Sequence, residues 1–282
     1  MTMTENRIKR KMRVLSICNL KGGVGKTTTA VNLAGILATD FGKRVLVIDN
    51  DQQGNASQFF QVFHPDNIGT AEILCLENEI DDCIKKTSNP NIDVVPANMN
   101  LAAANHDLIS RTSGMPTQIR LREALKQVAE DYDFAIIDNG PNLEVSFINA
   151  IVSSDDFIIP VKIDKYSFYG ISTLMDQIQD MSYWKPHINF VGCLVTMQHS
   201  GNQLENEGVE WLAGGHASTG NQRYKIMNTK IKYSPRVNDT TFGSELITVL
   251  SGRSQAARNY KELAAEYLEF VANNAVDDTA RV

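Results

Sequence analysis

Short, unbroken runs of apolar and β-branched residues recur along the chain and predict buried β-strands. There are six of these runs: Val14–Cys18, Val45–Ile48, Ile92–Val95, Phe134–Ile137, Phe157–Val161 and Val191–Val195. A strand with one face in water would alternate apolar and polar residues, and most of these runs do not. Because parallel strands are covered by helices on both faces, the pattern predicts an α/β fold with a doubly wound, mostly parallel sheet.

Helical periodicity separates several of the predicted strands. Apolar residues spaced i, i+4, i+7 predict a helix from Leu121 to Glu130, and a final helix has one apolar face from Tyr260 to Val271. The region Gln198–Asn228 is rich in Gly, Asn and Gln. There we expect a helix around Leu204–Leu212 and loop elsewhere, and long loops are commonly functional.

Composition narrows the class of protein. The 282 residues are 43% hydrophobic and 21% charged, which suits a buried core and excludes a disordered or fibrous chain. No Pro-, Gly- or Ser-rich linker divides the sequence. We therefore expect a basic arm at 1–12, a single domain at 13–273 and a tail at 274–282. The net charge of −6 argues against wholesale coating of nucleic acid but permits a local basic face.

Cysteine spacing and hydropathy indicate a reduced, cytoplasmic protein. The four cysteines, Cys18, Cys75, Cys83 and Cys193, include no C-x-x-C pair and fit neither a zinc site nor a disulfide framework. The basic N-terminus precedes an apolar run that is too short for a secretion signal. No apolar stretch reaches the roughly 18 residues that a membrane-spanning helix requires.

A glycine-rich loop directly follows the first predicted strand. It reads Lys21-Gly22-Gly23-Val24-Gly25-Lys26-Thr27-Thr28 and precedes a helix with apolar periodicity. A loop of this kind between a strand and a helix is typical of a phosphate-binding P-loop. The strict pattern G-x-x-x-x-G-K-[ST] is not met, because Leu20 occupies the first glycine position and Lys21 adds a second lysine.

Each residue type in this loop suits phosphate chemistry. Glycines let backbone N–H groups approach phosphate oxygens, and the N-terminus of the next helix adds a positive dipole. We expect Lys26 to reach the β- and γ-phosphates, Thr27 to join a Mg²⁺ shell, and Thr28 to donate to the α-phosphate. The predicted nucleotide-binding residues are Gly22, Gly23, Val24, Gly25, Lys26, Thr27 and Thr28.

Together with two later motifs, the loop resembles the ParA-type partition ATPases of the wider ParA/MinD group. The first motif runs from Val47 to Ser57 through Asp49 and Asp51, and the second is Phe134-Ala135-Ile136-Ile137-Asp138. The resemblance covers roughly Arg13 to Leu268. It implies a P-loop fold with a deviant Walker loop, ATP and Mg²⁺ as cofactors, and an ATP-dependent homodimer that encloses two nucleotides.

The resemblance implies a catalytic set of Lys21, Lys26 and Asp51. Lys21 matches the signature lysine, which crosses the dimer interface to the partner's phosphates and acts like an arginine finger. The alternative is that Lys21 is a solvated surface lysine. Asp51 matches the aspartate that positions the attacking water.

A metal site is also implied, made of Thr27, Asp49 and Asp138. Asp138 matches the Walker B aspartate, and its place after an apolar run puts it at the carboxyl edge of the sheet. Two carboxylates at a strand end can instead cap a helix and form a turn, and this alternative stays open for Asp49 and Asp51.

The chain departs from the family pattern in the loops after both carboxylate motifs. The family usually shows Asp-Pro-Gln-Gly and Asp-x-Pro-Pro, whereas this chain has Gln52 at the first proline and Asn139-Gly140-Pro141 after Asp138. These loops are expected to switch with the γ-phosphate, and loss of proline loosens them. The resemblance therefore does not set the rate of hydrolysis.

A basic segment near the C-terminal end is the expected DNA contact. No acidic residue occurs from Trp211 to Asn238, and the family's non-specific DNA contacts come from a similar region. The candidates are Arg223, Lys225, Lys230, Lys232 and Arg236. Pairing two such surfaces in a dimer would multiply DNA affinity through counterion release, although a merely solvated basic face has the same composition.

The expected function is an Mg-dependent ATPase of a DNA partition system. It would bind non-specific DNA, associate with the nucleoid when ATP is bound, and position plasmid or chromosome DNA with a centromere-binding ParB-like partner. One alternative is a biosynthetic ATP-dependent ligase or synthetase on the same fold. A MinD-like membrane ATPase is the other, and it would need a basic amphipathic C-terminal helix, whereas Glu262, Glu266 and Glu269 occupy this one.

Overall fold

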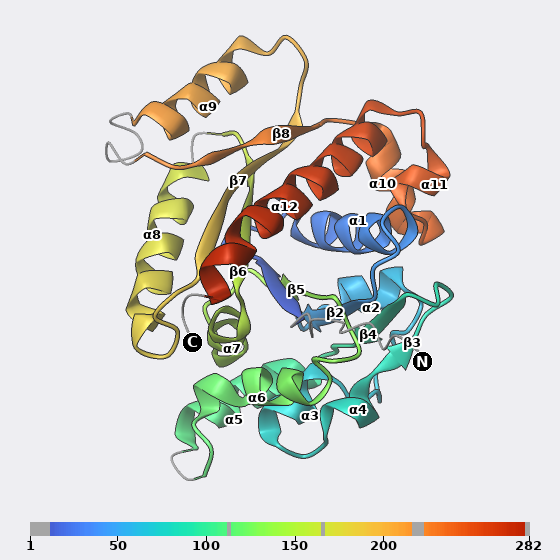
Figure 1. The fold of residues 1–282 in the computed structure, drawn as a ribbon, viewed down its shortest axis with the longest axis vertical. Coiled ribbons are helices and arrows are strands. Elements are labelled where there is room, and N and C mark those ends of the chain that lie inside the picture. Colours follow the sequence, from blue (N-terminus) through green and yellow to red (C-terminus); the bar gives the residue numbers. More distant parts are fainter. Residues whose placement is uncertain (1–11, 112–113, 165–166, 216–222, 280–282) are drawn as a thin grey trace, which may run out of the picture.

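The computed structural model describes residues 12–111, 114–164, 167–215 and 223–279. Within them, one sheet of eight strands has the order β3-β4-β2-β5-β1-β6-β7-β8 (Figure 1). The strands are β1 Arg13–Ile17, β2 Val45–Asn50, β3 Lys85–Lys86, β4 Ile92–Val95, β5 Phe134–Asn139, β6 Asp156–Lys162, β7 Asn189–Gln198 and β8 Ile226–Lys232. Only the short β3 pairs antiparallel in this sheet. The doubly wound, mostly parallel architecture predicted from the sequence is confirmed.

Helices connect the strands and cover both faces of the sheet (Figure 1). They are α1 Lys26–Thr39, α2 Asn55–Phe59, α3 Thr70–Cys75, α4 Ile80–Cys83, α5 Asn100–Ser110, α6 Arg120–Gln127, α7 Val145–Ser153, α8 Ser167–Asp180, α9 Gln203–Gly214, α10 Pro235–Gly243, α11 Ile247–Leu250 and α12 Gln255–Thr279. In the described part of the chain there are also 3₁₀ turns at Thr117–Ile119 and Met181–Tyr183.

Strand alternation assigns the buried side chains to opposite faces of the sheet. In β2, Val45 and Val47 join the apolar cluster under α1 and α12, whereas Leu46 and Ile48 join the cluster under α3 to α6. A third cluster packs α7 and α8 against β6 and β7. Both faces of the central strands are thus covered, which explains why their sequences are unbroken apolar runs.

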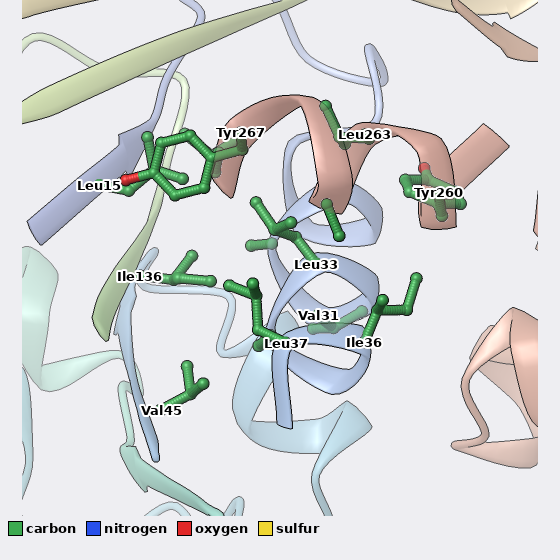
Figure 2. Packing of buried hydrophobic residues seen from close by; sticks show 14 of the residues in the cluster. Leu15, Val31, Leu33, Ile36, Leu37, Val45, Ile136, Tyr260, Leu263 and Tyr267 are labelled. Atoms are coloured by element: carbon green, nitrogen blue, oxygen red, sulfur yellow. The ribbon is translucent and has the colours of Figure 1, made fainter. Parts of the chain in front are cut away.

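Helix α1 lies in the interior and positions the P-loop. Its residues from Thr29 to Ala38 are all buried, because α12 covers the side that faces away from the sheet. Figure 2 shows Leu33 of α1 beneath Leu263 of α12, with Leu15 of the sheet beside Tyr267 and Ile136 to the left of Leu33. The start of α1 is therefore held rigidly at the carboxyl edge of the sheet.

The six predicted strands are all present, and α9 occupies the helix expected near Leu204–Leu212. The expectation of loop up to Asn228 was wrong, because β8 begins at Ile226. In this edge strand, buried Met227, Thr229 and Ile231 alternate with more exposed residues, so it lacks the apolar run of a central strand. Glu266 of α12 stabilises it by accepting two backbone hydrogen bonds at 2.8 Å.

Candidate nucleotide-binding site

The predicted P-loop lies between the end of β1 and the start of α1. Gly25 precedes α1 with φ +86°, a left-handed conformation that L side chains rarely adopt, so glycine is required there. No side chain among the described residues caps α1. The N–H groups of its first turn therefore have no side-chain acceptor, which is compatible with binding of an anion there.

Contacts from neighbouring strands hold the loop in place. The Asn19 side chain donates to the carbonyl of Pro160 at 2.7 Å and accepts from the N–H of Lys21 at 2.9 Å. The Thr196 hydroxyl donates to the carbonyl of Val24 at 2.8 Å. Val24 itself is 1% exposed, so only its backbone is placed to bind a ligand. Strands β6 and β7 thus shape the loop without filling it.

Lys26 places a buried cation inside this loop. The residue is 7% exposed, and its Nζ donates to the carbonyl of Lys21 at 3.1 Å. Burial lowers the pKa of Lys26, and the negative charges of Asp138 and Asp51 oppose that shift. The ammonium group is therefore inside the loop, where phosphate oxygens could pair with it.

Asp49 and Asp138 lie side by side because β2 and β5 pair in register at these two residues. Both are fully buried. Neither carboxylate oxygen of Asp138 makes a well-formed hydrogen bond among the described residues, although the Thr27 hydroxyl is near enough to lower its pKa. Burial, followed by the charge of Asp49, raises the pKa of Asp138 well above its usual range. Two buried, adjacent carboxylates are costly unless a cation compensates them.

This donor set fits Mg²⁺. Unpaired carboxylate oxygens of Asp138 and the neighbouring Thr27 hydroxyl are hard oxygen ligands, which Mg²⁺ prefers. The described residues contain no group of three or more His, Cys, Asp or Glu that could hold a metal ion alone. A site with one or two carboxylates is typical of Mg²⁺ that is bound together with nucleotide phosphates.

Asp49 has a different environment from Asp138. Its Oδ2 accepts from the N–H and hydroxyl of Ser57 at 2.7 and 2.6 Å, and its Oδ1 accepts from the N–H of Asp51 at 3.2 Å. Burial raises the pKa of Asp49 to about 7, against the effect of these hydrogen bonds. Asp49 thus fastens α2 to β2, which is the capping alternative left open by the sequence. The Ser57 partner was not anticipated.

Asp51 forms a turn at the mouth of the site. Its Oδ1 accepts from the N–H of Gln53 at 3.0 Å, the pattern of an Asx turn. Gly140 lies against it, because a Cβ at position 140 would be 3.4 Å from Asp51 Cγ. A side chain at position 140 would therefore touch the Asp51 carboxylate at ordinary van der Waals distance, a proximity that the sequence alone did not reveal.

Lys21, the expected trans cation, forms an ion pair within its own chain with Asp164, in the loop after β6. The Lys21 side chain is 32% exposed. For Lys21 to reach a partner's phosphates, this ion pair has to open. Asp164 is therefore a functional candidate that sequence reasoning missed.

Comparison with known proteins assigns the family. Residues 12–189 match a family described as an AAA domain. The chain is 34% identical to the sporulation initiation inhibitor protein Soj of Bacillus subtilis, over 90% of this chain and 97% of Soj. It is also 31% identical to the chromosome partitioning protein ParA of Myxococcus xanthus, over 91% of this chain and 88% of that protein. The chain belongs to the ParA family of partition ATPases.

The similarity extends to solved structures of the ParA/MinD fold. Cobyrinic acid a,c-diamide synthase from Mycobacterium smegmatis, with bound ATP analog and magnesium, superposes with a TM-score of 0.77 at 27% identity. The match covers 91% of this chain and 94% of that one. The fold, the P-loop context and the family therefore agree.

The cations of the basic segment, Arg223 to Arg236, are distributed over the start and end of β8 and over α10. Lys225 lies over the ring of Phe270 on α12, 4.9 Å from its centroid. Lys232 donates to the Gln198 side chain at the end of β7 at 2.7 Å. Because Lys225 precedes β8 and Lys232 ends it, they lie about 20 Å apart along the strand. Arg236 is on a third element, α10.

Beside the P-loop lies a hollow of about 40 Å³, which the sequence did not predict. It is lined by Gly25 and Thr28 of the P-loop, by Met197 of β7, and by Ser234 and Asn238 around the start of α10. Met197 has φ +55°, a conformation that non-glycine residues rarely adopt and that is often found at functional sites.

Proposed function

We propose that this protein hydrolyses ATP with Mg²⁺ and that an ATP-dependent homodimer binds non-specific DNA in a partition system. The observation that carries the proposal is the buried Lys26 at the start of α1, which feels the charge of the equally buried Asp138 at the end of β5. This combination offers a cation to phosphates and a carboxylate to a metal ion. The named relatives Soj and ParA support the partition role.

The proposed nucleotide site uses the loop backbone and three side chains. The N–H groups from Gly22 to Gly25 would hold the phosphates, Lys26 would pair with them, and Thr27 and Asp138 would hold Mg²⁺. The metal ion would neutralise charge on the transferred phosphoryl group. The ATP-analog and magnesium complex of the cobyrinic acid a,c-diamide synthase supports this assignment.

Two further residues have proposed roles in the reaction. Asp51, whose carboxylate lies at the mouth of the site, would orient the attacking water. Lys21 would leave Asp164 and stabilise negative charge on the nucleotide of the partner subunit.

The proposed partners are a second copy of this chain, DNA, and a ParB-like adaptor that binds a centromere site. With ATP bound, the protein would associate with the nucleoid. Hydrolysis would end DNA binding, because separation of the dimer halves the number of phosphates that the basic surface neutralises. ATP-dependent binding of duplex DNA tests the proposal.

Arg236 is the cation of the basic segment selected for a first test, because its side chain is 67% exposed on α10. Changing Arg236→Glu should weaken DNA binding in Mg-ATP about tenfold at 0.1 M salt, since a phosphate contact becomes repulsive. Dimerisation should not change. Fluorescence anisotropy with random-sequence duplex DNA measures the first quantity, and light scattering measures the second.

Lys126→Glu is a matched control for this test. Like Arg236 with Asp239, Lys126 is an exposed helical cation that pairs with an acidic residue three positions away, Glu123. It lies on α6, between β4 and β5 in the chain, and several strands of the sheet separate these two from β8. Equal DNA affinity for wild type and Arg236→Glu, or equal losses in both variants, would remove Arg236 from the DNA site.

A biosynthetic synthetase is the second candidate, and the structural match to a cobyrinic acid a,c-diamide synthase favours it. Phosphate release that requires a small-molecule carboxylate would identify that activity. Stimulation by DNA and an adaptor protein instead would identify the partition ATPase. Among the described residues, no helix is long and apolar enough to cross a bilayer.

A further inference from the structure

Two buried asparagines, Asn50 and Asn139, link the strand ends that carry the candidate catalytic carboxylates. They are 3% and 1% exposed, and they lie opposite each other where β2 pairs with β5. Asn50 Nδ2 donates to Asn139 Oδ1 at 2.8 Å and to the carbonyl of Ser146 at 3.0 Å. Asn139 Nδ2 donates to the carbonyl of Ile17 at 3.2 Å.

The orientation of the Asn50 amide follows from these partners. Both Asn139 Oδ1 and the Ser146 carbonyl are acceptors, so the nitrogen of Asn50 has to face them. Asn50 Oδ1 is left buried without a partner among the described residues. A buried, unpaired acceptor is destabilising, and an apolar pair could fill the same space without that cost. The pair is therefore better explained by positioning than by stability.

Each asparagine lies between two residues of the candidate site. Asn50 separates Asp49 from Asp51, and Asn139 separates Asp138 from Gly140. The Gly140 N–H also donates to the Asn50 carbonyl at 3.2 Å, so side chains and backbone join the same two turns. Since Gly140 lies beside the Asp51 carboxylate and its N–H bonds to the residue before Asp51, movement of either turn would change the position of that carboxylate relative to β5.

The hydrogen-bonded pair of Asn50 and Asn139, called the bridge below, is also connected to the P-loop and to α7. The Ile17 carbonyl that accepts from Asn139 is at the last residue of β1, two residues before the Asn19 side chain that anchors the loop. Ser146 belongs to the first turn of α7, directly after the loop that begins at Gly140. The end of β1, the turns after β2 and β5, and the start of α7 are thus connected through one amide pair.

We propose that Asn50 is a positioning residue, whose hydrogen bond to Asn139 fixes the Asp51 turn against the strand that bears Asp138. In this chain, with Gln52 and Gly140 at positions where the resembled family has proline, the bridge restricts the two turns that those prolines would otherwise stiffen. The inference rests on the proposed ATPase function. It assigns Asn50 to the hydrolysis step and not to nucleotide affinity.

The test compares Asn50→Leu, Asn139→Leu and the double variant. Asn50→Leu should lower kcat about tenfold and change the Kd for Mg-ATP less than about threefold, because the loop and Lys26 remain in place. The double variant should be no slower than the slower single variant, because both side chains act through one hydrogen bond. Single-turnover phosphate release and calorimetry provide the two quantities.

Asn149→Leu is the matched control for lost stability. Asn149 is equally buried in α7, but its side chain bonds to Thr117, Val145 and Leu121, away from β2 and β5. It should lower Tm without lowering kcat at a temperature where the protein is folded. An Asn50→Leu variant that keeps wild-type kcat, or additive losses in the double variant, would overturn the proposal.

Hydrogen exchange separates this inference from the proposed function. In nucleotide-free protein, Asn50→Leu should speed amide exchange in 50–54 and 139–146 about tenfold, whereas Asn149→Leu should leave 50–54 unchanged. If wild type hydrolyses no ATP, the proposed function fails, and this exchange measurement still decides the bridge. Unchanged exchange in Asn50→Leu would overturn it.

Discussion

Changing Lys26→Ala should abolish measurable ATP binding, with an affinity loss on the order of a hundredfold or more. Lys26 is the buried cation of the P-loop, and its Nζ lies inside the loop at the Lys21 carbonyl. Charge-assisted hydrogen bonds to phosphate are among the strongest polar contacts. The variant also removes positive charge beside Asp138, whose ionisation burial already disfavours. Calorimetry with Mg-ATP measures the loss.

Lys126→Ala serves as the control, because Lys126 is an exposed lysine on α6 that pairs with Glu123. Its ATP affinity should equal that of wild type. A circular dichroism spectrum and Tm should show that Lys26→Ala is folded. An affinity within threefold of wild type would mean that Lys26 does not contact the phosphates and that the nucleotide site is wrongly assigned.

The second large effect is expected from Lys21→Ala, which should bind ATP yet remain a monomer. Its hydrolysis rate should fall on the order of a thousandfold, the effect of removing a trans cation in phosphoryl transfer. The reason is that Lys21 lies outside the buried part of the site and pairs with Asp164, so ATP binding in the same chain does not require it. Light scattering with Mg-ATP reports the mass.

Asp164→Asn is the informative partner variant. It releases Lys21 from its ion pair and keeps the lysine, so ATP-dependent dimerisation should be retained or strengthened. An ATP-dependent dimer of Lys21→Ala would show that this lysine is not a trans contact. A monomeric Asp164→Asn would show that the ion pair supports the dimer and does not restrain it.

The central part of the fold could be predicted from the sequence because strands buried on both faces are unbroken runs of apolar residues. Edge elements were harder. In β8, partly exposed Lys230 and Lys232 alternate with buried residues. This pattern therefore led to the prediction of a loop and a basic patch in place of a strand. The short helices α3 and α4, of 6 and 4 residues, are below the length at which helical periodicity becomes visible.

The candidate site was predictable where chemistry is local and unpredictable where the fold brings distant residues together. The P-loop is contiguous, so its residue types suffice to identify it. The Lys21–Asp164 pair spans 143 positions, and the Asn50–Asn139 bond spans 89. These contacts depend on strand order and register, which a single sequence does not specify. Asp49 illustrates the same limit. Its hydrogen bonds to Ser57 could not be predicted without knowing where α2 lies relative to β2.

The most direct test of the central claim is DNA binding by Asp51→Ala, a variant intended to bind ATP and arrest before hydrolysis. Purified variant is titrated with random-sequence duplex DNA in Mg-ATP and in Mg-ADP at several salt concentrations, after calorimetry has shown that it binds ATP. We predict tight binding only with ATP, with a log affinity that falls by about 0.9 per phosphate contact for each log unit of salt. Equal binding in both nucleotides, or none in either, would contradict an ATP-switched partition ATPase.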